Sequence, residues 1–346
     1  RRSGETATNG HGTDMRSLRG LAEGWVQCVS DSVSEQNLGR LRSLVDYPFT
    51  LIDVGAGGGI NRRRWGRFRN LKVIGFEPDE REFKKLRDCE GSRWFQVALY
   101  GAEGVFDLNV TRYQTNTSLL EPNLEFLKGL HVPLTGYDIL RKVPLRCRTL
   151  DGLCQEHNLV PDVIKLDTQG TELDILRGGE MCLRRSIFAV EAEVEFLPFY
   201  RNQALFTDVH YYLSSLGFQL MDYLNPVRIR GREYGRGRGT PGHVLSADAL
   251  YFKSASRMVA DIEKTGLASL TAAVAICVAY DYDDYAQELC HIARQMVPDL
   301  GSQVAHHLRH LQGLPIHKWR RVRDFLTRFK ILRSVGKRLK WYLTPV

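Results

Sequence analysis

The sequence predicts an α/β fold with a mostly parallel sheet that helices cover on both faces, and three observations carry this prediction. Short, nearly continuous apolar segments recur between residues 46 and 254. Helical patterns separate several of these segments, as is usual for parallel strands. The first segment ends in an acid and four glycines, "DVGAGGG" (53–59), at a strand end of the kind where such sheets bind ligands.

The expected elements follow from the change between strand and helix periodicity. Strands are expected at 49–55, 71–78, 92–99, 161–167, 186–196, 218–223 and 248–253. Helices are expected at 16–45, 79–88, 149–162, 171–183 and 206–217, with further helices from 255 onward. The chain therefore divides into a polar leader with an N-terminal helix (1–45), an α/β domain (46–254) and a helical extension (255–346).

Composition and charge narrow the class of protein. The chain has 346 residues, of which 43% are hydrophobic and 25% charged, as in ordinary globular proteins. Its longest apolar stretch, 267–280, is too short to span a membrane and predicts a buried helix. The seven cysteines are scattered without a C-x-x-C pair, and no apolar signal segment follows the polar first residues. A cytoplasmic location is therefore expected.

The glycine-rich stretch follows the pattern Asp-x-Gly-x-Gly-x-Gly, formed by Asp53, Gly55, Gly57 and Gly59. A dinucleotide fingerprint requires a sixth-position glycine, where this chain has Ile60, and the Gly-Lys-Ser/Thr of a P-loop is absent. The pattern resembles the first motif of Rossmann-like S-adenosylmethionine-dependent methyltransferases. Glycines would let the backbone pass under the cofactor's amino-acid moiety, and Asp53 would take up its ammonium directly or through water.

A second acid is expected about 20 residues further on, to accept hydrogen bonds from the cofactor's ribose hydroxyls. Glu77 in "GFEPD" stands 20 residues after Gly57, at the end of the second expected strand. Glycines alone would be a weak signal. Glycines and a correctly spaced acid, each at a strand end, favour a nucleoside-bearing cofactor over a structural turn.

Further motifs resemble the FkbM family of methyltransferases. They are "VALYGAEGVFDL" (97–108), "VIKLDTQGTELDILRGGE" (163–180) and "VEFLPFYRNQALFTDVHYYLSSLGF" (194–218), in the family's order. The resemblance covers about 49–253 and implies a class I methyltransferase fold with a seven-stranded sheet. It implies S-adenosyl-L-methionine as cofactor, with Pro78, Val97 and Ala98 beside it, and methylation of a hydroxyl on a sugar, glycan or secondary metabolite. It says nothing about 255–346.

The fourth expected strand supplies the candidate catalytic residues. Asp167 ends this strand, so it should face the transferable methyl group and act as the general base. Lys165 lies two residues away on the same face, where its ammonium would hold Asp167 ionised or bind an acidic substrate. Glu172 opens the next helix and is either catalytic or an ordinary first-turn acid.

Three carboxylates alternate along the next strand. Glu191, Glu193 and Glu195 therefore point to one face, which is costly in a central strand unless they are paired or functional. Glu193 is a second candidate for catalysis, and Glu195 for binding substrate hydroxyls. A divalent metal held with Asp167 is the less favoured alternative, since no histidine joins them at ligand spacing.

A polar stretch and an arginine-rich loop complete the candidate acceptor site. Asn116 and Ser118, in "RYQTNTSLLEP" (112–122), would line the acceptor pocket unless this is an ordinary loop. The loop 228–238 carries five arginines and is either a solvated hairpin or a lid that clamps an acidic group of the acceptor.

The basic charge gathers at the C-terminus. Residues 318–340 contain ten Lys/Arg and one acid, against a net charge of +8 for the whole chain. An apolar stripe along this segment predicts an amphipathic helix that either packs on the body or a second subunit, or binds an anionic membrane at its inner face. Nucleic acid is the weaker partner, because no RNA-binding motif accompanies the charge. Three functions stay open: an active O-methyltransferase, a cofactor-binding module without catalysis, and a membrane-surface protein.

Overall fold

The computed structural model describes residues 48–66, 68–86, 91–231, 242–265 and 267–296. All of them lie within one compact unit. The expected helix at 16–45, the arginine loop beyond Gly231 and the basic tail fall outside the described residues and remain predictions. The proposed domain boundaries remain predictions as well.

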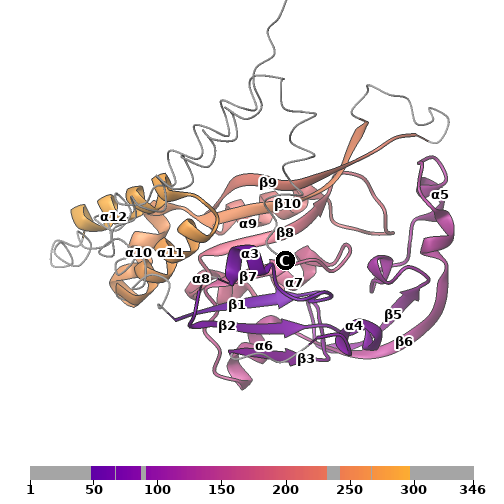
Figure 1. Cartoon of the computed structure of the whole chain (residues 1–346), viewed down its shortest axis with the longest axis horizontal. Coiled ribbons are helices and arrows are strands. Elements are labelled where there is room, and N and C mark those ends of the chain that lie inside the picture. Colours follow the sequence, from indigo (N-terminus) through magenta and orange to yellow (C-terminus); the bar gives the residue numbers. More distant parts are fainter. Residues whose placement is uncertain (1–47, 67, 87–90, 232–241, 266, 297–346) are drawn as a thin grey trace, which may run out of the picture. The chain divides into compact units, whose positions relative to one another are not determined.

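The central sheet has seven strands in the order β3-β2-β1-β7-β8-β10-β9 (Figure 1). Their bounds are Phe49–Val54 (β1), Leu71–Phe76 (β2), Ser92–Phe95 (β3), Val163–Leu166 (β7), Ala189–Glu195 (β8), Phe218–Ile229 (β9) and His243–Lys253 (β10). β10 runs antiparallel to β8 and β9, and the other pairs are parallel. This sheet confirms the predicted α/β fold, and its strand order reverses between β1 and β7, where such folds open a ligand crevice.

One face of the sheet carries the main apolar core. Side chains from the strands, such as Ile52, Ile164 and Val190, are fully buried there with residues of the helices. The helices are α6 (Leu150–Glu156), α7 (Glu172–Arg177), α8 (Glu180–Arg185) and α9 (Phe206–Ser215). The prediction of one helix over 171–183 is wrong: the chain breaks at Gly178, where a Cβ would lie 2.5 Å from the Tyr100 carbonyl oxygen.

The other face of the sheet meets α3 (Arg62–Trp65) and the segment that follows α11. Trp65 of α3 contacts Phe49 of β1, and Tyr280 contacts both Trp65 and Phe252 of β10. Helices α10 (Ala255–Thr265), α11 (Leu267–Ala279) and α12 (Asp283–Met296) pack on one another. The residues from Leu270 to Tyr280 are buried, as predicted. Within the described ranges, no helix is long and apolar enough to cross a membrane.

A three-stranded sheet interrupts the central fold between β3 and α6. It has the order β4-β6-β5, with bounds Ala98–Leu99 (β4), Gly104–Thr111 (β5) and Ile139–Arg148 (β6). Its loop carries η1 (Gln114–Asn116), α5 (Leu124–Leu127) and η2 (Leu134–Tyr137), and α4 (Glu80–Phe83) follows β2. Figure 1 shows β5 and β6 beyond the carboxyl ends of β1 and β2. The sequence pattern missed this small sheet because β6 is largely exposed and lacks a continuous apolar run.

Candidate active site

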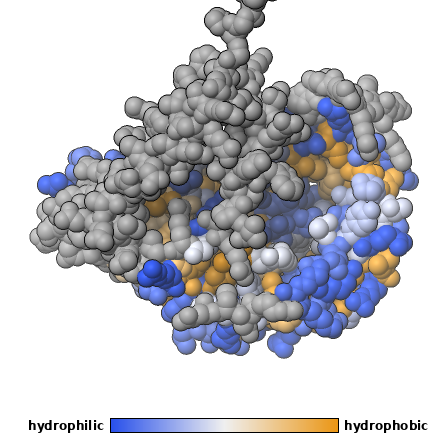
Figure 2. Space-filling view, in the orientation of Figure 1, coloured by the Kyte–Doolittle hydropathy of each residue, from blue (hydrophilic) through white to orange (hydrophobic). Residues whose placement is uncertain are grey.

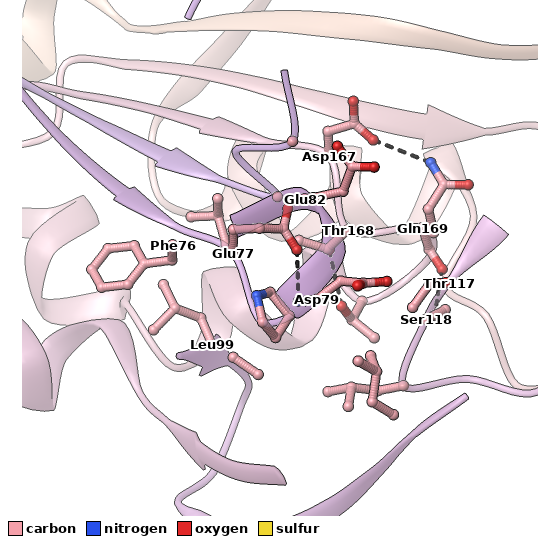
Figure 3. Close-up of a pocket in the computed structure, with 18 of the residues that line it drawn as sticks. Phe76, Glu77, Asp79, Glu82, Leu99, Thr117, Ser118, Asp167, Thr168 and Gln169 are labelled. Carbon is pink, nitrogen blue, oxygen red and sulfur yellow. Dashed lines mark hydrogen bonds between the residues drawn. The ribbon is translucent and has the colours of Figure 1, made fainter. Parts of the chain in front are cut away.

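A cavity of about 370 Å³ opens at the carboxyl ends of β1, β2, β7 and β8 (Figure 3). Figure 2 shows hydrophilic residues in a hollow on this face of the molecule, with apolar residues close by. The lining includes nine residues that the sequence had singled out: Gly55, Gly57, Glu77, Pro78, Val97, Ala98, Ser118, Asp167 and Glu193. Six other candidates do not line it: Asp53, Gly59, Asn116, Lys165, Glu172 and Glu195.

The glycines after β1 have different tasks. Gly55 has a φ of +74°, and a Cβ there would lie 1.9 Å from the carbonyl oxygen of Asp167, so the loops after β1 and β7 touch at this point. A Cβ at Gly57 would approach the Glu77 Oε2 to 3.3 Å, whereas nothing lies within 4 Å at Gly58 or Gly59. The loop therefore exposes main chain to open space, which suits close approach by a ligand.

Asp53 lies one residue inside the end of β1 and is 2% exposed. Its Oδ1 is 3.7 Å from the Lys165 Nζ and has no hydrogen-bond partner among the residues that the structure describes. Burial raises the pKa of Asp53, and the charge of Lys165 opposes that rise. A buried carboxylate oxygen with spare capacity, beside the glycine loop, fits a cationic ligand group.

Glu77 follows β2, and its side chain reaches the cavity wall (Figure 3). Its Oε1 accepts a hydrogen bond from the Asp79 backbone N–H at 2.8 Å. Burial raises the pKa of Glu77 to about 7, although hydrogen bonds from the Asp79 and Gly57 backbones oppose the shift. This carboxyl is available to hydroxyl groups of a ligand that lies along the glycine loop.

The loop after β7 carries Gln169, whose side-chain amide bridges the carboxyl groups of Asp167 and Glu193. Asp167 has a side chain 41% exposed, and its two oxygens accept hydrogen bonds from Gln169 Nε2 (3.1 Å) and Lys165 Nζ (3.5 Å). The same Gln169 Nε2 donates to Glu193 Oε2 at 2.6 Å, and the Tyr200 hydroxyl donates to Gln169 Oε1. The sequence pattern does not distinguish Gln169 as a site residue, although Gln169 lies within the motif at 163–180.

A buried acid stabilises the left-handed backbone conformation of this loop. Gln169 has a φ of +60° and Gly170 one of +105°. The Glu172 carboxylate accepts hydrogen bonds from the Thr168 N–H, the Thr168 hydroxyl and the Gly170 N–H, at 2.7–3.0 Å. Burial raises the pKa of Glu172. Its contacts place Glu172 as a support for the loop behind the cavity wall.

The three carboxylates of β8 have separate surroundings. Glu191 is paired with Arg64 and the Tyr280 hydroxyl. Burial, reinforced by Asp167, raises the pKa of Glu193 well above its usual value, and burial with the charge of Glu172 does the same for Glu195. In the described part of the chain, no group of three His, Cys, Asp or Glu side chains could hold a metal ion.

Strand β5 of the inserted sheet and the loop between β5 and β6 supply the opposite wall of the cavity. Ser118 lines it, and its hydroxyl donates to the Gln169 carbonyl oxygen at 2.8 Å. Asn116 does not; its backbone carbonyl accepts from the Tyr200 hydroxyl. Sequence reasoning had not singled out the other lining residues of this wall, which are Leu108, Gln114, Thr115, Thr117 and Leu119. All but one of these lie in the polar stretch that it had noted.

The sheet order, the glycine loop between an acid and the crevice, and the second acid after β2 together define a class I, S-adenosylmethionine-dependent methyltransferase. Within this class, residues 53–220 match the model of the methyltransferase FkbM domain. Residues 53–220 are thus similar to an FkbM methyltransferase domain, and the predicted resemblance is confirmed over that range.

The chain is also similar to individual proteins. The chain is 28% identical over 185 residues to the 2-O-methyltransferase NoeI of Sinorhizobium fredii, across 49% of this chain and 73% of that protein. Among solved structures it matches a methyltransferase FkbM from Methylobacillus flagellatus with 14% identity and a TM-score of 0.34, over 60% of this chain and 44% of that one. A TehB-like methyltransferase from Corynebacterium glutamicum matches with 12% identity and a TM-score of 0.28, over 69% of this chain and 99% of that one.

Proposed function

We propose that the protein transfers a methyl group from S-adenosylmethionine to a hydroxyl of a sugar, glycan or secondary metabolite. The observation that carries the proposal is the meeting of Gly57, Glu77, Asp167 and Glu193 around one cavity at the switch point of the sheet. The 2-O specificity in the name of the NoeI relative supports oxygen as the acceptor atom. A glycan or small-molecule acceptor follows from the family's usual substrates.

The residues present fit the cofactor. Asp53 has a buried oxygen free for an ammonium group, and the open space above Gly58 and Gly59 admits close passage over the main chain. Glu77 would accept hydrogen bonds from ribose hydroxyls, with Val97 and Ala98 beside it on the wall. When bound, the cofactor would supply an electrophilic methyl group on a positively charged sulfur.

The protein's own contribution to the reaction is positioning and proton transfer. Asp167 is the general base: its Oδ atoms are held by Gln169 and Lys165, and its exposed side chain reaches the acceptor side of the cavity. Burial and the neighbouring Asp167 raise the pKa of Glu193, which favours the neutral form of Glu193 beside the proposed base. In this arrangement Asp167 takes the proton of the acceptor hydroxyl.

The test has a binding arm and a turnover arm. Calorimetry should show that the purified protein binds S-adenosylmethionine or S-adenosylhomocysteine at least about a hundredfold more tightly than NAD, a difference of roughly 2.7 kcal/mol. Comparable affinity for NAD would contradict the assignment. Labelled S-adenosylmethionine, screened by mass spectrometry against neutral and acidic sugars, should then transfer its methyl to an acceptor oxygen. Binding without transfer to any acceptor would favour the cofactor-binding module instead.

A further inference from the structure

A row of charged side chains crosses the sheet behind the cavity. Asp53 of β1, Lys165 of β7 and Glu191 of β8 are neighbours in register, and side chains at paired positions of parallel strands share a face. Lys165 therefore stands between two carboxylates. Its Nζ lies 3.7 Å from Asp53 Oδ1 and 3.5 Å from Asp167 Oδ2, on the side of the cavity.

Glu191 is turned to other partners. Its Oε2 accepts a hydrogen bond from the Tyr280 hydroxyl at 2.7 Å and forms an ion pair with Arg64 Nη1. The Arg64 guanidinium lies 4.3 Å from the centre of the Tyr280 ring, so the two donors also support one another. Tyr280 and Glu191 are 7% and 8% exposed, which makes the hydrogen bond a buried one.

We propose that Tyr280, the residue after α11, is a positioning residue for the active site. It holds the Glu191 carboxylate away from Lys165, so that the Lys165 ammonium stays on Asp53 and Asp167. The inference rests on the proposed function, because it concerns the groups that would meet the cofactor's ammonium and the acceptor hydroxyl. It also gives the helical extension, whose role the sequence left open, a part in the site.

Loss of the hydroxyl has a directional consequence. Without the Tyr280 hydroxyl, the buried Glu191 carboxylate lacks one hydrogen-bond donor. The Lys165 ammonium can replace that donor, because Lys165 is the neighbour of Glu191 in the strand register. Moving the ammonium toward Glu191 removes the charge that favours ionised Asp53, so Asp53 binds a proton at higher pH than before. As the pH is lowered, cofactor affinity therefore begins to fall at a higher pH than in the parent. The charged groups that act on Lys165 are Asp53, Asp167, Glu191 and Asp248.

The experiment compares Tyr280→Phe with Tyr285→Phe. The Tyr285 hydroxyl donates to the Lys253 carbonyl oxygen at 3.0 Å and is also buried, so the control loses a similar hydrogen bond between the extension and the sheet. Calorimetry with S-adenosylhomocysteine between pH 6 and 9 needs no acceptor. We expect the loss of affinity toward low pH to begin about one pH unit higher in Tyr280→Phe than in the parent, a difference of up to about tenfold in affinity where Asp53 titrates. Tyr285→Phe should match the parent.

A second background shows whether Glu191 transmits the effect. In Glu191→Gln no carboxylate competes for Lys165, so adding Tyr280→Phe should change the affinity less than about twofold. The inference is overturned if Tyr280→Phe behaves like Tyr285→Phe, if its effect persists in the Glu191→Gln background, or if circular dichroism shows that it has lost its fold. A parent protein that binds no S-adenosylhomocysteine would instead contradict the proposed function.

Discussion

Glu191 and Glu193, two glutamates on the same face of strand β8, have opposite surroundings. At the inner end, Glu191 is closed in by the Arg64 guanidinium and the Tyr280 hydroxyl. At the carboxyl end, Glu193 meets the amide of Gln169 and the neighbouring acid Asp167, and its pKa is raised by burial and by that acid. The alternation of the sequence placed all three glutamates on one face. The partners brought by α3, the loop after β7 and the extension decide which of them is paired within the fold and which lines the cavity.

The strongest way to break this comparison is Asp167→Asn. An amide cannot take the acceptor's proton but keeps the hydrogen-bonding shape, so turnover should fall by roughly 10²–10⁴. Cofactor affinity, measured by calorimetry, should stay within a few-fold of the parent, since Asp167 is not expected to hold the cofactor. Unchanged turnover would move the general base to Glu193.

A side chain added at Gly57 should weaken cofactor binding, whereas Asp167→Asn should leave it nearly unchanged. Gly57→Val would project toward Glu77 Oε2, where even a Cβ comes to 3.3 Å. We expect loss of cofactor binding by about a hundredfold or more, while the melting temperature changes little, because φ at this position is not in the left-handed region. A large fall in the melting temperature would show that Gly57 serves the fold rather than the ligand.

Glu77 should make cofactor binding depend on pH near neutrality. Its pKa of about 7 means that the carboxyl is mostly protonated at pH 6 and mostly ionised at pH 8. The ionised form accepts two ribose hydroxyls better, so affinity should rise by roughly five- to tenfold over this range. In Glu77→Gln the affinity should be weaker and nearly independent of pH. A parallel slope in the variant would assign the titration to another group.

The smallest effect concerns stability and compares the two ends of β8 directly. Because the folded pKa of Glu193 is raised, the native state binds the proton more tightly, and this carboxyl costs stability as pH rises above its usual value of 4.5. Glu193→Gln should therefore raise the melting temperature at pH 8 by roughly 2–4 °C, and less at pH 5. Glu191→Gln should lower it, because Arg64 loses its charged partner. Changes of the same sign in the melting temperatures of both variants would contradict the difference drawn between Glu191 and Glu193.

The sequence predicted the cavity lining near the glycine loop and Glu77 better than the lining that the inserted sheet supplies. Asp53, the glycines and Glu77 follow from strand ends, and the strand ends follow from local apolar runs. Gln169 and Tyr200 depend on a loop with a left-handed residue and on a contact between distant segments, which periodicity cannot foresee. The small sheet was missed for a related reason, since its strands are held by pairing with one another more than by burial.

The insertion between β3 and α6 has a consequence for how such an enzyme can change. The cofactor wall is built from the ends of central strands, where any shift would disturb the core. The facing wall comes from β5 and the residues that follow it, which belong to a separate small sheet with many exposed positions on β6. On the proposed function, substitutions at its exposed positions would change which acceptor is methylated while the strand ends that meet the cofactor stay in place. The two walls can therefore vary independently, one constrained by the core and the other by the acceptor.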